Sequence, residues 1–84
     1  MKEPKEAIIR YVCISDDATI RSTRCIISEA TDLINLIAAT NVVCIENAGK
    51  DYDGEYVVEW VSFLPAIDEQ HLDVVNIMLE PQDL

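Results

Sequence analysis

The side chains best suited to chemistry in this chain are its carboxylates. Its 84 residues include 16 Asp and Glu, alongside one histidine and three cysteines. Glu55 and Glu59 are predicted to lie on one face of a strand, about 13 Å apart at roughly 3.3 Å per residue. Cooperating carboxylates at an active site lie closer together than this. We therefore predict no catalytic residues and expect a protein that is not an enzyme.

The segment Asp51-Tyr52-Asp53-Gly54 has the composition of a calcium-binding loop. If Gly54 held the sixth position of an EF-hand loop, the first position would be Gly49 and the twelfth would be Trp60. That loop requires an acid at its first position and a bidentate Glu at its twelfth. The segment is therefore predicted to be a polar turn, and neither a metal nor a cofactor is expected.

The cysteines Cys13, Cys25 and Cys44 lack the paired spacing of a zinc site or a disulfide framework. Each has apolar neighbours in the sequence, which favours a buried free thiol. Apolar burial raises the pKa of a thiol and makes it a poor nucleophile. His71 is expected to pack on the apolar side of a helix rather than to act as a base.

Charge divides the chain into two unequal halves. Residues 1–41 hold six acids and five bases, whereas residues 42–84 hold ten acids and Lys50 as their only base. The predicted partner-binding surface is drawn from the acids of the second half: Asp51, Asp53, Glu55, Glu59, Asp68, Glu69, Asp73 and Glu80. The formal net charge of -10 repels phosphates, so direct binding of nucleic acid is not expected.

The length of the chain suits one domain over residues 1–84, with flexible ends at 1–6 and 81–84. Apolar runs fall short of the roughly 18 to 20 residues that a membrane-spanning helix needs. The first residues also lack the hydrophobic segment of a secretory signal. A cytoplasmic protein without a membrane partner is expected.

Residues 7–14 and 18–27 are rich in β-branched types and alternate in polarity, which predicts a β-hairpin. Asp16-Asp17 is suited to a two-residue turn, which would place Ile9 opposite Arg24.

A helix is predicted next, over 29–39, with Ser28 as its N-cap and Thr40-Asn41 at its end. The uninterrupted apolar run 42–45 is typical of a buried central strand. Both glycines mark a loop at 47–54, and the alternating residues 55–63 predict a fourth strand.

Residues 68–79 suit a helix by spacing and a strand by composition. The spacing places Ile67, His71, Val74 and Met78 on one stripe and favours the helix. The predicted fold is α+β: a two-layer, four-stranded, mostly antiparallel sheet with two helices on one face, in the order ββαββα. The alternative makes the last segment a fifth strand.

The uncovered face of such a sheet would hold Val12, Ile14, Val57 and Val61, which is too apolar to be left in water. These residues predict a homodimer interface or another apolar contact.

Two main functions follow from these features, and a small enzyme or accessory subunit with an unrecognised carboxylate site is a third. In the first, the chain is an inhibitor that mimics the charge of DNA and occupies the basic surface of a nucleic-acid-binding protein. Glu69 and Asp73 would then lie about 6 Å apart along a helix axis, close to the spacing of successive phosphates. Small acidic proteins of this kind recur in viruses of bacteria, and the likeness is one of size and charge. In the second, the chain is an adaptor that binds through its apolar sheet face, and its acids serve solubility only.

Overall fold

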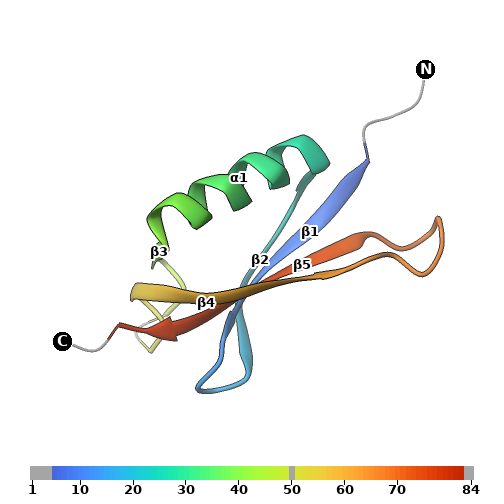
Figure 1. The fold of residues 1–84 in the computed structure, drawn as a ribbon. Helices are drawn as coiled ribbons and strands as arrows, with labels where there is room; N and C mark the ends of the chain where they lie inside the picture. The colour runs from blue at the N-terminus through green and yellow to red at the C-terminus, as the bar shows by residue number, and fades with distance from the viewer. Residues whose placement is uncertain (1–4, 50, 83–84) are drawn as a thin grey trace.

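The computed structural model describes residues 5–49 and 51–82, which form five strands and one helix (Figure 1). In chain order they are β1 (Glu6–Cys13), β2 (Ala18–Ile26), α1 (Ile27–Thr40), β3 (Val42–Ile45), β4 (Gly54–Leu64) and β5 (Asp73–Pro81). The α+β class is confirmed, whereas the order is ββαβββ and not ββαββα. Of the flexible ends predicted at 1–6 and 81–84, residues 1–4 and 83–84 lie outside the described residues.

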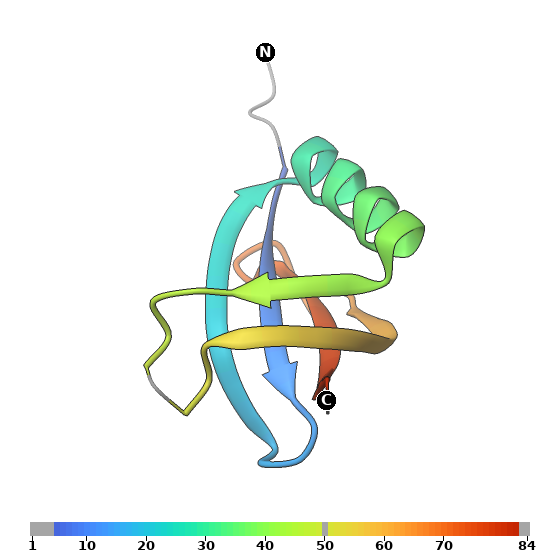
Figure 2. The same ribbon diagram turned by 90° about the vertical axis from the view of Figure 1, so that its left-hand side faces the viewer.

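The strands form one mixed sheet in the order β2-β1-β5-β4-β3. β1 and β5 run parallel, and the other neighbours are antiparallel. The sheet curls strongly into a half-barrel, so that β3 and β4 cross in front of β1 and β2 in Figure 2, with α1 beyond one end of them. A curled five-stranded sheet with one helix therefore replaces the predicted four-stranded sheet with two helices on one face.

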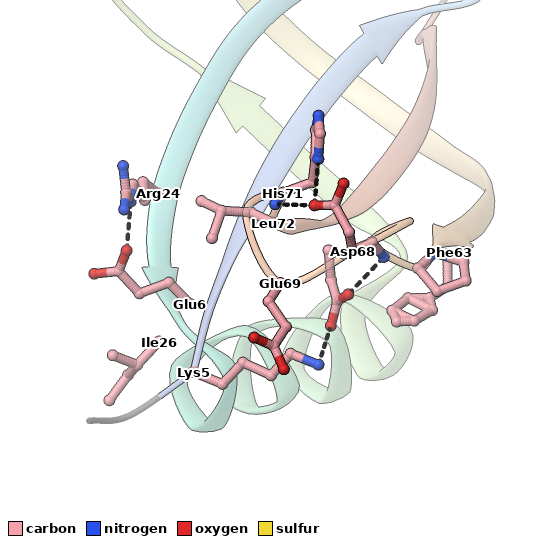
Figure 3. Close-up of a pocket in the computed structure, with 12 residues that line it drawn as sticks. Lys5, Glu6, Arg24, Ile26, Phe63, Asp68, Glu69, His71 and Leu72 are labelled. Carbon is pink, nitrogen blue, oxygen red and sulfur yellow. Dashed lines mark hydrogen bonds and ion pairs between the residues drawn. The ribbon is translucent and has the colours of Figure 1, made fainter. Parts of the chain in front are cut away.

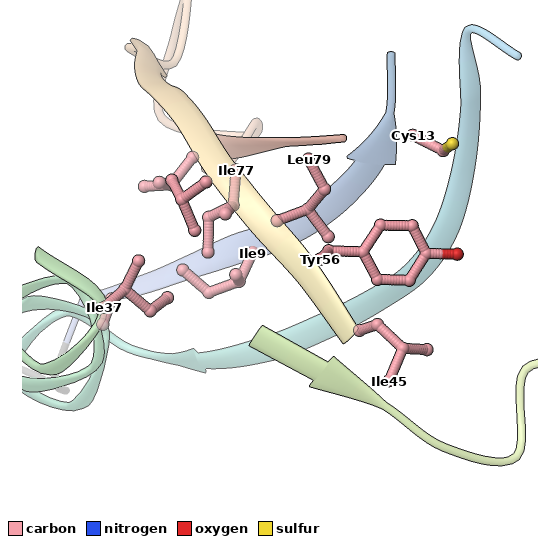
Figure 4. Packing of buried hydrophobic residues seen from close by; sticks show 10 residues of the cluster. Ile9, Cys13, Ile37, Ile45, Tyr56, Ile77 and Leu79 are labelled. Carbon is pink, nitrogen blue, oxygen red and sulfur yellow. The ribbon is translucent and has the colours of Figure 1, made fainter. Parts of the chain in front are cut away.

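The hydrophobic core fills the inner face of this half-barrel (Figure 4). Its members come from β1, α1, β3, β4 and β5 and include Ile9, Ala30, Ile37, Ile45, Tyr56, Ile77 and Leu79. Alternate residues of a strand point to opposite faces. The buried odd-numbered residues of β5 therefore define the inner face, and its half-buried even-numbered residues define the outer face.

The predicted second helix is wrong, because residues 73–81 form strand β5. β5 lies between β1 and β4, and its burial alternates with a period of two through Asp73, Val75, Ile77 and Leu79. A central position suits the β-branched composition of this run. The fifth strand, which the sequence offered as the alternative, is the one adopted.

The β1–β2 hairpin is confirmed, but its predicted register is wrong. Ile9 pairs with Thr23 rather than Arg24, because the turn spans 14–17 and not the two aspartates alone. Asp17 donates its backbone N–H to the Ile14 carbonyl at 3.2 Å and has a φ of 51°. The longer turn moves the partners of Val12 and Cys13 by two residues, and an irregularity between Tyr11 and Val12 reduces the shift to one residue along the rest of β1.

Helix α1 is confirmed, and it begins earlier than predicted. Its N-cap is Ile26, which makes no side-chain capping hydrogen bond, so Ser28 is not the cap. The C-terminal end agrees with the sequence: Asn41 has a φ of 59° and donates its N–H to the Ile37 carbonyl at 2.6 Å. Asparagine tolerates this left-handed conformation better than most residues.

β3 is confirmed as a strand but is not the buried central strand that was predicted. It lies at an edge of the sheet, pairs only with β4, and exposes Val42 and Cys44 while Ile45 is buried. An uninterrupted apolar run does not by itself distinguish an edge strand that covers the core from a central one.

A β-bulge divides β4 into two parts. Val58 pairs with Leu79, whereas Trp60 pairs with Met78, so Glu59 is an additional residue and the alternation restarts after it. The alternation of an unbroken strand would place Trp60 on the same face as Val58. It lies instead on the outer face, with 53% of its surface exposed.

Candidate acidic interface

The structure gathers acids from both halves of the chain at one end of the sheet. The carboxyl ends of β1 and β5 lie side by side because these strands are parallel, and the Ile14 N–H donates to the Leu79 carbonyl at 2.9 Å. The start of β4 joins the same end, where the Gln82 N–H donates to the Glu55 carbonyl at 3.1 Å. We call this region the acidic end and define it by Asp16, Asp17, Asp51, Asp53, Glu55 and Glu80.

The loop before β4 is folded by one of its own acids. The Ala48 N–H donates to Asp53 Oδ1 at 2.8 Å, and the Asp53 N–H donates to the Gly49 carbonyl at 3.0 Å. Gly49 has a φ of 100°, a conformation that residues other than glycine rarely adopt. These contacts hold the loop in a defined shape, with Asp51 exposed beside Asp53.

Two tyrosines join this loop to the core and to the β1–β2 turn. The buried Tyr56 donates its hydroxyl to the Tyr52 carbonyl at 2.6 Å. The Asp16 carboxylate lies beside the Tyr52 hydroxyl, and its charge raises the pKa of that phenol. The pKa of Tyr56 is also raised, chiefly by burial. The turn and the loop therefore form one continuous acidic surface.

The cations of the described residues have partners other than the acids of the turn and the loop. Lys5 pairs with Asp73 at 3.2 Å and Arg24 with Glu6 at 2.5 Å. Arg21 donates to the backbone carbonyl of Glu46, and Arg10 donates to the Thr19 hydroxyl at 3.5 Å. Within the described part of the chain, no salt bridge reaches Asp16, Asp17, Asp51, Asp53 or Glu55.

Three of the predicted surface acids lie at the opposite end of the sheet. Asp68 and Glu69 belong to the loop between β4 and β5, and Asp73 begins β5. Figure 1 shows this loop far from the β1–β2 turn. Because no helix forms here, the predicted spacing of Glu69 and Asp73 along a helix axis does not apply. Glu59 lies exposed at the bulge, between the two ends.

Asp73 is not a surface acid, because only 5% of it is exposed. The Ala66 N–H donates to its Oδ1 at 2.8 Å, and Lys5 pairs with its other oxygen. These interactions lower the pKa of Asp73, with the hydrogen bond from Ala66 as the largest cause. The carboxylate therefore anchors the loop and is not available to a partner.

Asp68 organises the same loop (Figure 3). One of its oxygens accepts hydrogen bonds from the Gln70 N–H at 2.8 Å and the His71 N–H at 3.1 Å. His71 Nδ1 lies 2.6 Å from that oxygen and is the largest cause of the lowered pKa of Asp68. His71 is thus an exposed loop residue, and its predicted packing on a helix is wrong.

A wide cleft opens beside this loop. Its lining residues are Lys5, Glu6, Arg24, Ile26, Phe63, Pro65, Ala66, Asp68, Glu69, His71, Leu72 and Asp73. They include a His–carboxylate pair but no serine, threonine or cysteine. Such a pair activates a nucleophile only when one lies within hydrogen-bond reach. The lining therefore does not include the Ser–His, Thr–His or Cys–His pair of a side-chain hydroxyl or thiol nucleophile.

The four predicted apolar contact residues do not share one face. Val12 and Val57 pair with outer-face residues of β5, whereas Val61 pairs with the inner-face residue Ile77. Ile14 lies in the β1–β2 turn. Val12 is only 9% exposed and offers little surface to a partner.

Sequence reasoning missed the strongest concentration of exposed apolar side chains. Trp60, Val61, Phe63, Leu64 and Ile67 are all substantially exposed, from 39% for Val61 to 84% for Ile67. The local signal was present, because residues 60–67 carry no charge. The alternation of β4, however, predicted that half of them would be buried.

The cysteines are free, and they range from buried Cys13 through partly buried Cys25 to exposed Cys44. The prediction that all three are buried is therefore wrong for Cys44. Within residues 5–49 and 51–82, no group of three or more potential ligand residues could hold a metal ion.

The helix of the described chain is too short to cross a membrane. Comparison with protein-family models, with curated proteins and with solved structures gives no match for this chain.

Proposed function

We propose that this chain is a small protein-binding inhibitor that mimics the charge of nucleic acid and occupies the basic nucleic-acid-binding surface of a partner protein. The observation that carries the proposal is the acidic end. It gathers carboxylates from the turn, the loop and the strands, and five of them, Asp16, Asp17, Asp51, Asp53 and Glu55, are reached by no salt bridge within the described residues. Acids fixed on ordered elements attract a basic groove without paying the full entropy cost of ordering a flexible acidic tail.

The strands supply a suitable spacing of charge. Glu80 lies opposite Val57, so Glu55 is its diagonal neighbour on the same face. Diagonal neighbours across antiparallel strands lie about 7–8 Å apart. This separation is comparable to that of successive phosphates on one DNA strand, and the aspartates of the turn and loop extend the array.

The test uses two variants of equal net charge. The first reverses two exposed acids of the acidic end, in D51K/E55K. The control reverses two exposed acids elsewhere, in D32K/E69K. Immobilised wild-type protein captures basic proteins from the lysate of the native host at low salt. Each captured protein is then allowed to bind a labelled DNA duplex. Wild type or one of the two variants is added, and release of the duplex is measured.

Wild type and the control are expected to displace the duplex, whereas D51K/E55K is expected to need at least about tenfold more protein. Equal displacement by both variants would reject the acidic end as the contact surface. Failure of both variants alike would show that total charge, and not this arrangement, drives binding.

The adaptor function remains a second candidate because the structure exposes large apolar side chains at 60–67. An apolar contact is little affected by salt, whereas charge mimicry weakens steeply as salt rises. Capture of neutral partners at both low and moderate salt, with no basic protein enriched, would favour the adaptor.

A further inference from the structure

The second half of β4 is an open edge of the sheet. β3 pairs only with residues from Gly54 to Val57, and the Val58 N–H donates to the Asn41 carbonyl at 3.1 Å. From Glu59 to Leu64, no other strand of the described chain pairs with this side of β4. Helix α1 packs against β1, β2 and β3 instead. The backbone groups of this edge are therefore available to another strand.

Both faces of this edge expose apolar side chains. Val61 and Phe63 pair with the buried residues Ile77 and Val75, so they lie on the inner face, where 39% and 57% of their surfaces are exposed. Trp60 and Leu64 lie on the outer face and are 53% and 58% exposed. Soluble proteins usually protect such an edge with a charge, a cover or a kink. Here the bulge and the charge of Glu59 lie at the start of the edge, whereas residues 60–64 carry no charge and pair with no other described strand on this side.

We propose that this edge is occupied by the same edge of a second copy, in an antiparallel pair centred on Ser62. The geometry of sheets restricts the register, because residues that lie opposite each other must point to the same face. Centring on Ser62 places Trp60 opposite Leu64 of the partner subunit on the outer face. It places Val61 opposite the partner's Phe63 on the inner face.

This register is self-complementary in side-chain type. The four flanking cross-strand pairs are all apolar, and two of them join an aromatic ring to a β-branched side chain, a favourable combination across strands. Centring the pair one residue earlier, on Val61, would instead place Glu59 opposite the partner's Phe63. Residues 60–64 carry no charge and the acidic end lies beyond the other end of β4, so the acids nearest to the pair, Glu59 and those of the β4–β5 loop, lie at its margins.

The area suits a dimer of moderate affinity. Aromatic side chains can bury roughly 150–250 Å² each, so half-exposed Trp60 and Phe63 with Val61 and Leu64 offer on the order of 400 Å² per copy. With the paired backbones, two copies approach the lower end of the roughly 1,200–2,000 Å² found in specific interfaces. Dimerisation is therefore expected at micromolar concentrations.

The register is tested by disulfide trapping in a background with C25S and C44S. Opposed Ser62 residues in the dimer are close enough for S62C to form a disulfide across the axis. V61C is the matched control. In this register the two copies of residue 61 lie two positions apart along the paired strands, so their Cα atoms are about 8 Å apart, which is beyond the reach of a disulfide. S22C is a second control, on the exposed edge strand β2.

Non-reducing electrophoresis after mild oxidation is expected to show efficient crosslinking of S62C and at least about tenfold slower crosslinking of V61C and S22C. Sedimentation should show a concentration-dependent dimer for wild type and a monomer for V61K, with circular dichroism confirming that V61K folds. A monomeric wild type at about 500 μM, or crosslinking through S22C at the rate of S62C, would overturn the proposal. Dimer formation is measured on the pure protein without a partner. The outcome of this test is therefore independent of whether the chain mimics the charge of nucleic acid.

Discussion

The carboxylate of Asp73 shows how context decides what one residue does. In the sequence it is one of many acids in the second half of the chain and was predicted to face a partner. In the structure it is buried at the start of β5 and holds the β4–β5 loop through Ala66 and Lys5. A run of acids cannot reveal which member is buried, because burial depends on the strand register.

Replacing Asp73 by Asn should destabilise the fold at neutral pH. Its pKa is lowered in the folded state, so the ionised carboxylate stabilises the fold above its unfolded pKa of about 3.9. This contribution is lost as pH falls through the lowered folded pKa. Urea unfolding at pH 7 and at pH 2 should therefore show a clear deficit for D73N at the higher pH and a smaller one at the lower. E69Q, in the same loop but exposed, should unfold like wild type at both.

Ile77 is the corresponding test of the core. Its side chain is fully buried on the central strand β5, so I77A should lower the free energy of unfolding by about 2–5 kcal/mol. Ile67 has the same chemistry but is 84% exposed, and I67A should change stability by less than about 0.5 kcal/mol. Chemical denaturation of both variants makes the comparison, and equal losses would contradict the assignment of the inner face.

At the scale of elements, the sequence predicted every strand up to β4 and helix α1, because the periodicities of β1, β2, β4 and α1 are distinct and β3 is a short apolar run. It failed at residues 68–79, where Ile67, Val74 and Met78 fit a helical stripe while the neighbouring residues fit a strand. Local spacing cannot decide between a helix and a strand here, because the strand is stabilised by its pairing with β1 and β4, which are distant in the sequence. The bulge at Glu59 was equally hidden, because one additional residue leaves no compositional signal.

The end of α1 can be tested at Asn41. Its φ of 59° is strained for most side chains, so N41A should lower stability by about 1 kcal/mol, whereas N41G should stay within about 0.5 kcal/mol of wild type. Thermal unfolding followed by far-ultraviolet circular dichroism measures both changes. An N41A variant as stable as wild type would mean that the left-handed cap does not form.

At the scale of the whole molecule, the sequence shows which half of the chain holds the excess of acids but not how these acids are arranged on the surface. Counting charges assigned the acidity to residues 42–84. The fold instead adds Asp16 and Asp17 to one end and moves Asp68 and Asp73 to the other. This rearrangement depends on the parallel pairing of β1 with β5, a long-range contact that composition does not encode.

The two proposed surfaces should respond to salt in opposite ways. The acidic end attracts a basic partner by charge, so its affinity should fall by at least about tenfold between 50 and 200 mM salt. The β4 edge joins two chains that repel each other, each with a net charge of -10. Salt screens that repulsion, so the dimer should keep its affinity or bind more tightly over the same range. Sedimentation and duplex displacement on the same samples measure both, and a dimer that dissociates as salt rises would show that ion pairs, and not the apolar pairs around Ser62, hold it together.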